Sequence, residues 1–259
     1  MKISVITVCY NSARTIRATL ESVSAQRHRD FEHIVVDGGS TDGTLELLRD
    51  WHSHPLQLLS GPDRGMYDAM NKGIAAATGD VVGFLNSDDR YADDQALVSI
   101  ANALSDQTVD CCHGNLVFVD ASSRRMLRYW KGTEFRPRQF KLGWMPAHPT
   151  LYVRRSLFTA AGAFSLAYRV AADVEWMMRL FSRAGLRCAC IPRVLIEMDA
   201  GGVSNAGSHA FLRANREVWR ACRTLRIAPA PFVLGKIMRK LPQWLHARRV
   251  GRIAVRPFQ

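Results

Sequence analysis

An apolar run meets an acidic cluster in the stretch Val81-Val82-Gly83-Phe84-Leu85-Asn86-Ser87-Asp88-Asp89. A short apolar run of this kind is typical of a buried strand in a parallel sheet. The acidic cluster then stands at the carboxyl end of the strand, where open α/β sheets bind ligands. Clustered carboxylates at such a position suit a hard divalent cation that carries a diphosphate. The alternative is that Asp88 or Asp89 caps a helix that begins near Ala92.

Strand and helix signals alternate through the first hundred residues. The expected strands are Ile3–Tyr10, His33–Val36, Leu56–Ser60 and Val81–Leu85, and the clearest expected helices are Met66–Ala77 and Ala92–Leu104. Strict alternation of the two signals predicts an α/β fold with a mostly parallel sheet and helices on both faces.

The alternation loosens after residue 105. An antiparallel pair is expected at Cys112–Val119 and Met126–Trp130, a helix at Asp173–Ala184, a strand at Leu186–Ile196 and a helix from about His209 to Leu225. We therefore divide the chain into residues 1–105, residues 106–205 of the same domain, and a basic helical extension at 206–259.

Composition excludes several classes of protein. Of the 259 residues, 47% are hydrophobic and 22% charged, which is typical of a soluble globular protein. No apolar run approaches the roughly 18 residues needed to span a bilayer. The six cysteines form neither a CxxC pair nor a zinc spacing, so we expect a reducing cytosol. The chain lacks GxGxxG and GxxxxGK[ST], which argues against a dinucleotide fold and a phosphate-loop kinase.

Positive charge is concentrated near the C-terminus. Residues 206–259 hold ten Arg and two Lys against one acid, Glu217, so the first 205 residues carry only about +1 of the net +12. Cationic helices with aromatic anchors suit an anionic membrane surface, and we expect a peripheral position on the inner face of the membrane. Aromatic residues interleaved with these cations include Trp219, Phe232, Trp244 and Phe258. Nucleic acid is not expected, because no nucleic-acid-binding motif is present.

Another acid follows the second expected strand. Asp37 comes directly after Ile34-Val35-Val36, so its carboxylate faces the same edge of the sheet as Asp88. There it can accept hydrogen bonds from the base or ribose of a nucleotide. The alternative is a turn in which Asp37 supports Gly38 and Gly39.

Four segments carry a family resemblance. They are Ile3–Asn11, Val35–Thr44, Asp63–Ile74 and Phe84–Asp89. In that order they resemble the family 2 glycosyltransferases, and more narrowly the bacterial enzymes of exopolysaccharide assembly such as the colanic acid group. The resemblance is strong over residues 1–95 and patchier to about residue 205.

The resemblance implies a GT-A fold, a nucleotide-diphospho-sugar donor and a divalent metal, Mn²⁺ or Mg²⁺. Residues 1–105 would form the nucleotide-sugar-binding half and residues 106–205 the acceptor-binding half. By carry-over, Asp37 would hold the nucleobase, and Asp88 would face the metal. The other residues around the nucleotide would be Thr7, Tyr10, Asp63 and Asn71. Asn86 stands where the family's DxD motif has its first acid, and an amide brings no charge to the metal.

The resemblance also implies a catalytic base in the acceptor half. Ala171–Leu180 matches the family segment in which an aspartate opens a helix, so we expect Asp173 to take the proton of the acceptor hydroxyl. The alternative is that Asp173 only caps that helix. His148 resembles a residue on the acceptor side, and Trp176 either stacks on a sugar or packs in the core. Gly201-Gly202-Val203-Ser204 resembles a loop near the donor diphosphate.

The resemblance therefore implies an inverting glycosyltransferase of polysaccharide or glycolipid assembly, acting on a saccharide or a polyprenyl-diphosphate-linked acceptor. One alternative is a non-catalytic nucleotide-sugar-binding module, which Asn86 favours. Another is a sugar-phosphate nucleotidylyltransferase. That class should open with a Gly-rich basic loop, whereas Asn11-Ser12-Ala13-Arg14 follows the first expected strand here.

Overall fold

A computed structural model describes residues 1–200, 207–240 and 243. Its strands are β1 (Ile3–Cys9), β2 (Phe31–Asp37), β3 (Gln57–Ser60), β4 (Val81–Phe84), β5 (Asp89–Tyr91), β6 (Cys111–Val119), β7 (Met126–Trp130), β8 (Tyr152–Arg154) and β9 (Cys188–Asp199). Its helices are α1 (Ile16–Ser24), α2 (Thr44–Arg49), α3 (Met66–Ala76), α4 (Ala96–Ala103), α5 (Pro137–Lys141), α6 (Ser156–Ala161), α7 (Ala172–Phe181), α8 (Gly207–Thr224) and α9 (Pro229–Met238), with a 3-10 turn at His148–Thr150.

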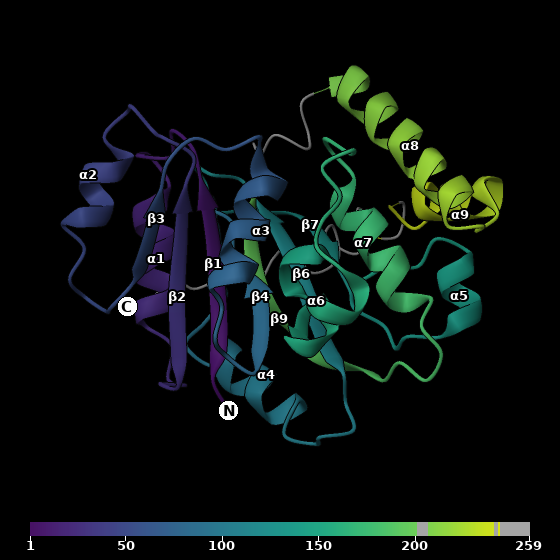
Figure 1. Cartoon of the computed structure of the whole chain (residues 1–259), viewed down its shortest axis with the longest axis horizontal. Helices are drawn as coiled ribbons and strands as arrows, with labels where there is room; N and C mark the ends of the chain where they lie inside the picture. The colour runs from purple at the N-terminus through teal and green to yellow at the C-terminus, as the bar shows by residue number, and fades with distance from the viewer. Residues whose placement is uncertain (201–206, 241–242, 244–259) are drawn as a thin grey trace.

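The first four strands form the parallel half of one sheet. Its order begins β3-β2-β1-β4, and each neighbouring pair among these four strands runs parallel. In Figure 1, α3 crosses the front of this half while α1 lies behind it. The predicted α/β fold is confirmed here, because buried strands alternate with helices that cover both faces.

The second half of the chain extends the same sheet with mixed pairing. The order continues β8-β6-β9-β5, with β7 on the side of β6. β8 is antiparallel to both β4 and β6, whereas β9 runs parallel to β6. The predicted antiparallel pair is β6 with β7. The division at residue 105 stays a prediction, since this sheet continues through both halves.

A short strand follows the acidic cluster where we had considered a helix cap. Asp89 opens β5, which pairs with β9, and α4 begins only at Ala96. The N-cap of α4 is Gln95, and it makes no side-chain cap hydrogen bond. The capping alternative for Asp88 and Asp89 is therefore wrong.

The two halves of the sheet meet at β4, where close packing requires glycine. A Cβ atom at Gly83 would lie 2.1 Å from Cε1 of Tyr152. The Tyr152 ring is fully buried, and its hydroxyl lies 2.5 Å from the hydroxyl of Tyr91. Any larger residue at 83 would displace this ring pair. The packing of β8 against β4, the seam between the two halves of the sheet, therefore requires glycine at this position.

A chain of hydrogen bonds crosses the buried face of β1 and β2. Trp51 Nε1 donates to His54 Nδ1 at 3.1 Å, and His54 Nε2 lies 2.9 Å from His33 Nδ1. His33 Nε2 lies 2.9 Å from Oγ1 of Thr7. Because an indole N–H can only donate, both imidazoles must be neutral and each Nε2 must carry the proton. Burial, and then the neighbouring His54, lower the pKa of His33 to about 3.

The described part of the basic extension, residues 207–240 and 243, includes two helices that pack against the rest of the chain. α8 packs against α9 and α7, on one side of the sheet (Figure 1). Phe232, which we had expected at a membrane surface, is fully buried, so that expectation is wrong for this residue. Trp219 is 44% exposed, and Trp244 and Phe258 lie outside the described residues. No helix in the described ranges is both long and apolar enough to cross a bilayer.

We expect the His33 chain to make folding pH-dependent. Since the folded pKa of about 3 lies below the usual 6.5, only the unfolded state gains this proton as the pH falls below 6.5. The free energy of unfolding should fall by about 2 kcal/mol between pH 7.5 and pH 5 through His33 alone. His33→Gln keeps a donor and an acceptor but does not titrate. Between the same two pH values, its free energy of unfolding in urea denaturation should fall by about 2 kcal/mol less than that of wild type. Equal losses in wild type and His33→Gln would contradict the assignment, and the exposed His52→Gln is the control.

Candidate active site

The loops after β1, β2 and β4 are tied to one another at the carboxyl edge of the parallel strands. Asn11 adopts a left-handed backbone (φ 50°), its N–H donates to Ser40 Oγ at 2.8 Å, and its Oδ1 accepts from Thr41 N at 2.9 Å. The hydroxyls of Ser12 and Ser87 lie 2.8 Å apart. The loop that carries Asp88 is thereby joined to the loop after β1.

Asp37 ends β2 and organises the loop that follows it. Its buried carboxylate accepts hydrogen bonds from Gly39 N (3.1 Å), Ser40 N (3.1 Å), Ser60 Oγ (2.9 Å) and Ser40 Oγ. Burial works to raise the pKa of Asp37, but these hydrogen bonds prevail and lower it, so the group stays ionised. This is the turn-supporting role that we had left open, and contact with a nucleobase stays a prediction.

Two other predicted residues meet around Gly38. A Cβ atom at this glycine would lie 2.5 Å from Oδ2 of Asp63 and 3.4 Å from the ring of Tyr10. Tyr10 is 64% exposed, and Asp63 accepts a hydrogen bond from Gly65 N at 2.8 Å through Oδ1. An exposed ring and a carboxylate therefore flank the backbone of the Asp37 loop, and their contact with a nucleotide stays a prediction.

Thr7 and Asn71 do not fit the nucleotide role that we predicted. Thr7 is fully buried in β1, and its hydroxyl belongs to the His33 chain. Asn71 donates to Phe164 O and accepts from Phe164 N, both at 2.9 Å. Strand alternation turns Thr7 into the core, and the amide of Asn71 joins α3 to the segment before α7.

The acidic cluster contains two buried oxygen atoms without a hydrogen-bond partner. Asn86 Nδ2 donates to Asp89 Oδ2 at 2.9 Å, while Asn86 Oδ1 and Asp89 Oδ1 are buried with no hydrogen-bond partner among the described residues. Burial, followed by the charge of Asp88, raises the pKa of Asp89 well above its usual value. Asp88 is less buried than Asp89 and is the acid of this cluster that is more open to a ligand.

Asp88 lies across the strand pair from another acid. The antiparallel register Asp89↔Met198 sets Asp88 opposite Asp199 at the end of β9. Burial and, further down, the charge of Asp199 raise the pKa of Asp88. Arg124, from the β6–β7 turn, forms ion pairs with Asp199 at 2.8 Å and with Glu197. Asp199 was not among our predicted residues, because a 111-residue separation hides the pairing in the sequence.

These residues fit a divalent cation only in part. The Asp88 carboxylate and the unpaired Asn86 Oδ1 are hard oxygen donors of the kind that Mg²⁺ and Mn²⁺ prefer. Within the described ranges, no group of three or more His, Cys, Asp or Glu side chains could hold a metal. The chain therefore offers an incomplete shell that oxygens of a bound diphosphate would have to complete.

Asp173 lies in the first turn of α7 and is held by a residue from α3. The hydroxyl of Tyr67 donates to Asp173 Oδ1 and to Val170 O, both at 2.9 Å. The N-cap of α7 is Ala171, so the alternative that Asp173 caps the helix is wrong. Burial and then the charge of Asp173 strongly raise the pKa of Tyr67, which therefore stays protonated and donates. Tyr67 stands inside a matched segment, yet we had given it no role.

The charge of Asp173 acts on the pKa of two basic side chains. His148 stacks on Phe84, at the end of β4, with ring centroids 5.3 Å apart. Burial lowers the pKa of His148 and that of Lys236 in α9, and the charge of Asp173 opposes both shifts. The acceptor role of His148 stays a prediction. We had counted Lys236 only as part of the basic extension.

Trp176 is a core residue. Its side chain is 1% exposed, its ring stacks on Phe158 with centroids 4.6 Å apart, and its Nε1 donates to Gly162 O at 2.8 Å. Of the two roles that we had left open for Trp176, packing in the core is the one that the structure supports, because the inner face of α7 is buried. The loop at 201–204 lies outside the described residues.

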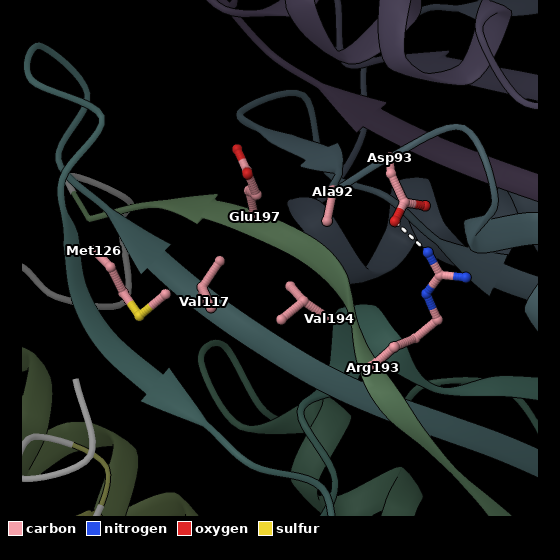
Figure 2. A pocket seen from close by; sticks show the side chains of 7 residues that line it. All are labelled: Ala92, Asp93, Val117, Met126, Arg193, Val194 and Glu197. Carbon is pink, nitrogen blue, oxygen red and sulfur yellow. Dashed lines mark hydrogen bonds and ion pairs between the residues drawn. The ribbon is translucent and has the colours of Figure 1, made fainter. Parts of the chain in front are cut away.

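A pocket of about 280 Å³ is lined by Glu197, the ion-pair partner of Arg124, but not by Asp37, Asp88 or Asp173. Figure 2 shows its lining, which includes an ion pair between Asp93 and Arg193 and the apolar side chains of Val117 and Met126. None of our predicted site residues lines this pocket. The candidate active site is therefore the edge between Asp88 and Asp173.

The comparisons with known proteins identify the family. Residues 4–168 match the family described as glycosyl transferase family 2. The chain belongs to the family 2 glycosyltransferases. This family 2 glycosyltransferase is 36% identical over 216 residues to an uncharacterized glycosyltransferase of Mycobacterium tuberculosis, covering 80% of this chain and 77% of the relative. It is 32% identical over 208 residues to a PGL/p-HBAD biosynthesis glycosyltransferase of Mycobacterium bovis, covering 78% of each.

Solved structures show the fold of this glycosyltransferase. Staphylococcus aureus TarS, residues 1–349 in complex with UDP-GlcNAc, superposes with a TM-score of 0.69 at 20% identity, covering 96% of this chain and 70% of TarS. A mannosyltransferase of Pyrobaculum calidifontis in complex with GDP-Man and Mn²⁺ gives 0.65 at 22% identity, covering 96% and 74%. The expected GT-A fold is confirmed, whereas the narrower exopolysaccharide resemblance is not.

We expect Asn71→Leu to lower stability without touching nucleotide binding. The change leaves the N–H and C=O of Phe164 without their partner, which should cost about 3 kcal/mol in urea denaturation. The exposed Asn102→Leu is the matched control. Unchanged stability with lost nucleotide binding would instead restore the role that the resemblance implied.

Proposed function

We propose that this family 2 glycosyltransferase transfers a sugar from a nucleotide-diphospho-sugar to a hydroxyl acceptor with inversion. The observation that carries the proposal is the placement of Asp88 and Asp173. Asp88 follows β4, in a loop that the Ser12–Ser87 hydrogen bond joins to the loop after β1. Asp173 is hydrogen-bonded to Tyr67, which lies at the start of α3. A single displacement needs groups of both kinds, one on the leaving diphosphate and one on the attacking hydroxyl.

Asp173 is the base of the proposed reaction. It takes the acceptor proton as the hydroxyl oxygen attacks the anomeric carbon and the bond to the diphosphate breaks. The hydrogen bond from Tyr67 to Oδ1 fixes the rotation of the carboxylate and leaves Oδ2 for the acceptor. We keep His148, whose pKa responds to the charge of Asp173, as a proposed further polar group on the acceptor side.

The donor lies along the edge formed by Tyr10, the Asp37 loop, Asp63 and Asp88. The exposed Tyr10 ring and the backbone after Asp37 suit a base and ribose, and Asp88 with Asn86 faces the diphosphate. A divalent metal bound there would stabilise the departing diphosphate as a Lewis acid. The UDP-GlcNAc and GDP-Man complexes of the two structural neighbours support a donor of this class. We expect Asn86 to give weaker metal affinity than a second aspartate would.

We also propose that α8 meets an anionic membrane surface, where a lipid-linked acceptor would lie. Leu212 (64% exposed) and Trp219 (44% exposed) are seven residues apart and therefore share one face of the helix. The arginines at 213, 216, 220 and 223 are exposed beside them. An exposed apolar pair flanked by cations suits anionic headgroups.

The test of the proposed reaction is a thermal-shift screen of nucleotide diphosphates and nucleotide-sugars, with and without Mn²⁺ or Mg²⁺. A ligand that binds only the folded state raises its melting temperature, here by roughly 5–10 °C at about 100 times Kd. We expect one nucleotide class to give a metal-dependent shift. No shift with any compound would favour a non-catalytic module.

Two variants separate the roles at this site. Asp88→Asn should lose the metal-dependent shift while its ligand-free melting temperature stays near that of wild type. Asp173→Asn should keep the shift but lose sugar transfer to an acceptor. Transfer that survives in Asp173→Asn would remove this residue from the mechanism.

Vesicle sedimentation tests the membrane surface. We expect the protein to bind vesicles that contain phosphatidylglycerol and not vesicles of phosphatidylcholine alone, with weaker binding as salt rises. Trp219→Ala should weaken binding roughly tenfold, since it removes one apolar anchor. Met66→Ala, at an exposed apolar residue on α3, is the control. Equal binding to both vesicle types, or binding only to RNA, would contradict the proposal.

A further inference from the structure

The segment before α7 presents three consecutive backbone N–H groups to one side chain. Glu217 of α8 accepts from Arg169 N at 3.1 Å, from Val170 N at 2.9 Å and from Ala171 N at 3.0 Å. A carboxylate at the amino-terminal end of a helix also interacts favourably with the helix dipole. The side chain thus does for α7 what its N-cap residue, Ala171, cannot do.

Glu217 accepts hydrogen bonds from the backbone, although arginines lie nearby on the same helix. Arg213 and Arg220 lie four residues before and three residues after it, at spacings that permit ion pairs. Yet Glu217 takes part in none of the ion pairs that the described residues form. Arg220 instead stacks over the Tyr168 ring at 4.6 Å, on the same segment. Two neighbouring residues of α8 therefore hold one short stretch of chain.

One peptide group connects Glu217 to the catalytic carboxylate. In the peptide between Val170 and Ala171, the N–H donates to Glu217 and the C=O accepts from Tyr67. The same Tyr67 hydroxyl donates to Asp173. Because this peptide is held at both ends, it cannot rotate without breaking a hydrogen bond, and the Tyr67 hydroxyl keeps its position between Val170 and Asp173.

We propose that Glu217 is a positioning residue that fixes the segment before α7 and so aligns Tyr67 and Asp173 for proton transfer. The proposal rests on the proposed role of Asp173 as base. It assigns to the C-terminal helices a part in catalysis that is separate from any contact with a membrane. A small displacement of a reacting group is enough to cost a large factor in rate, which is why a contact outside the site can matter.

The test compares Glu217→Gln with wild type and with Arg216→Gln, an exposed change on the same helix. Gln has nearly the same shape but turns an NH₂ group toward backbone donors. Hydrogen–deuterium exchange should rise for residues 169–171 of the ligand-free variant, while the rest of α7 stays protected. The kcat for transfer should fall roughly tenfold or more, and donor KM should stay within about twofold.

Each outcome bears on the proposal. Unchanged exchange at residues 169–171 would show that Glu217 does not hold this segment, and would overturn the proposal whether or not the protein transfers sugar. Faster exchange with an unchanged kcat would overturn the positioning role. If the wild type binds no donor and transfers no sugar, the proposed function is wrong. Hydrogen–deuterium exchange of the ligand-free protein would still show whether Glu217 holds residues 169–171. If Glu217→Gln does not fold, Glu217→Asp keeps the charge but shortens the reach and takes its place in both measurements.

Discussion

The structure depends on the seam at β4, where a parallel sheet becomes antiparallel. Gly83 leaves room for the buried Tyr152 ring, so β8 can pair with β4 and bring the second half of the chain against the first. Phe84, one residue later, stacks on His148. The loop with Asp88 follows at once. Both sides of the active site therefore meet at this strand, and a side chain at residue 83 would separate them.

The proposed donor side of the site includes a buried carboxylate, that of Asp37, which is surrounded by hydrogen-bond donors. Asp37 stays ionised because Gly39, Ser40 and Ser60 surround its carboxylate with donors, although burial opposes this. Asp89, buried beside Asp88, accepts a hydrogen bond from Asn86 Nδ2, and burial raises its pKa. The pKa values of these two buried acids therefore shift in opposite directions, since more donors surround Asp37 than Asp89.

Sequence reasoning predicted what short-range rules control. Asp37 and Asp88 stand at strand ends because parallel strands share a carboxyl edge, and Asp173 lies in the first turn of α7, where the family resemblance predicted an aspartate that opens a helix. The sequence could not give the direction of a side chain. Thr7, expected at the nucleotide, points into the core, and Trp176, for which two roles were open, does the same. Contacts across long separations were missed altogether, including Asp88 with Asp199 and the segment before α7 with Glu217. No local pattern encodes such pairs, because tertiary packing alone brings them together.

The proposed donor edge and the proposed base depend on distant parts of the chain. The loops after β1, β2 and β4 are tied directly to one another within the first ninety residues. The segment that leads into Asp173 is held from α8, more than forty residues later. A substitution in α8 can therefore move the segment before Asp173 while the contacts among these three loops stay intact. Selection can thus adjust the two regions of one fold independently.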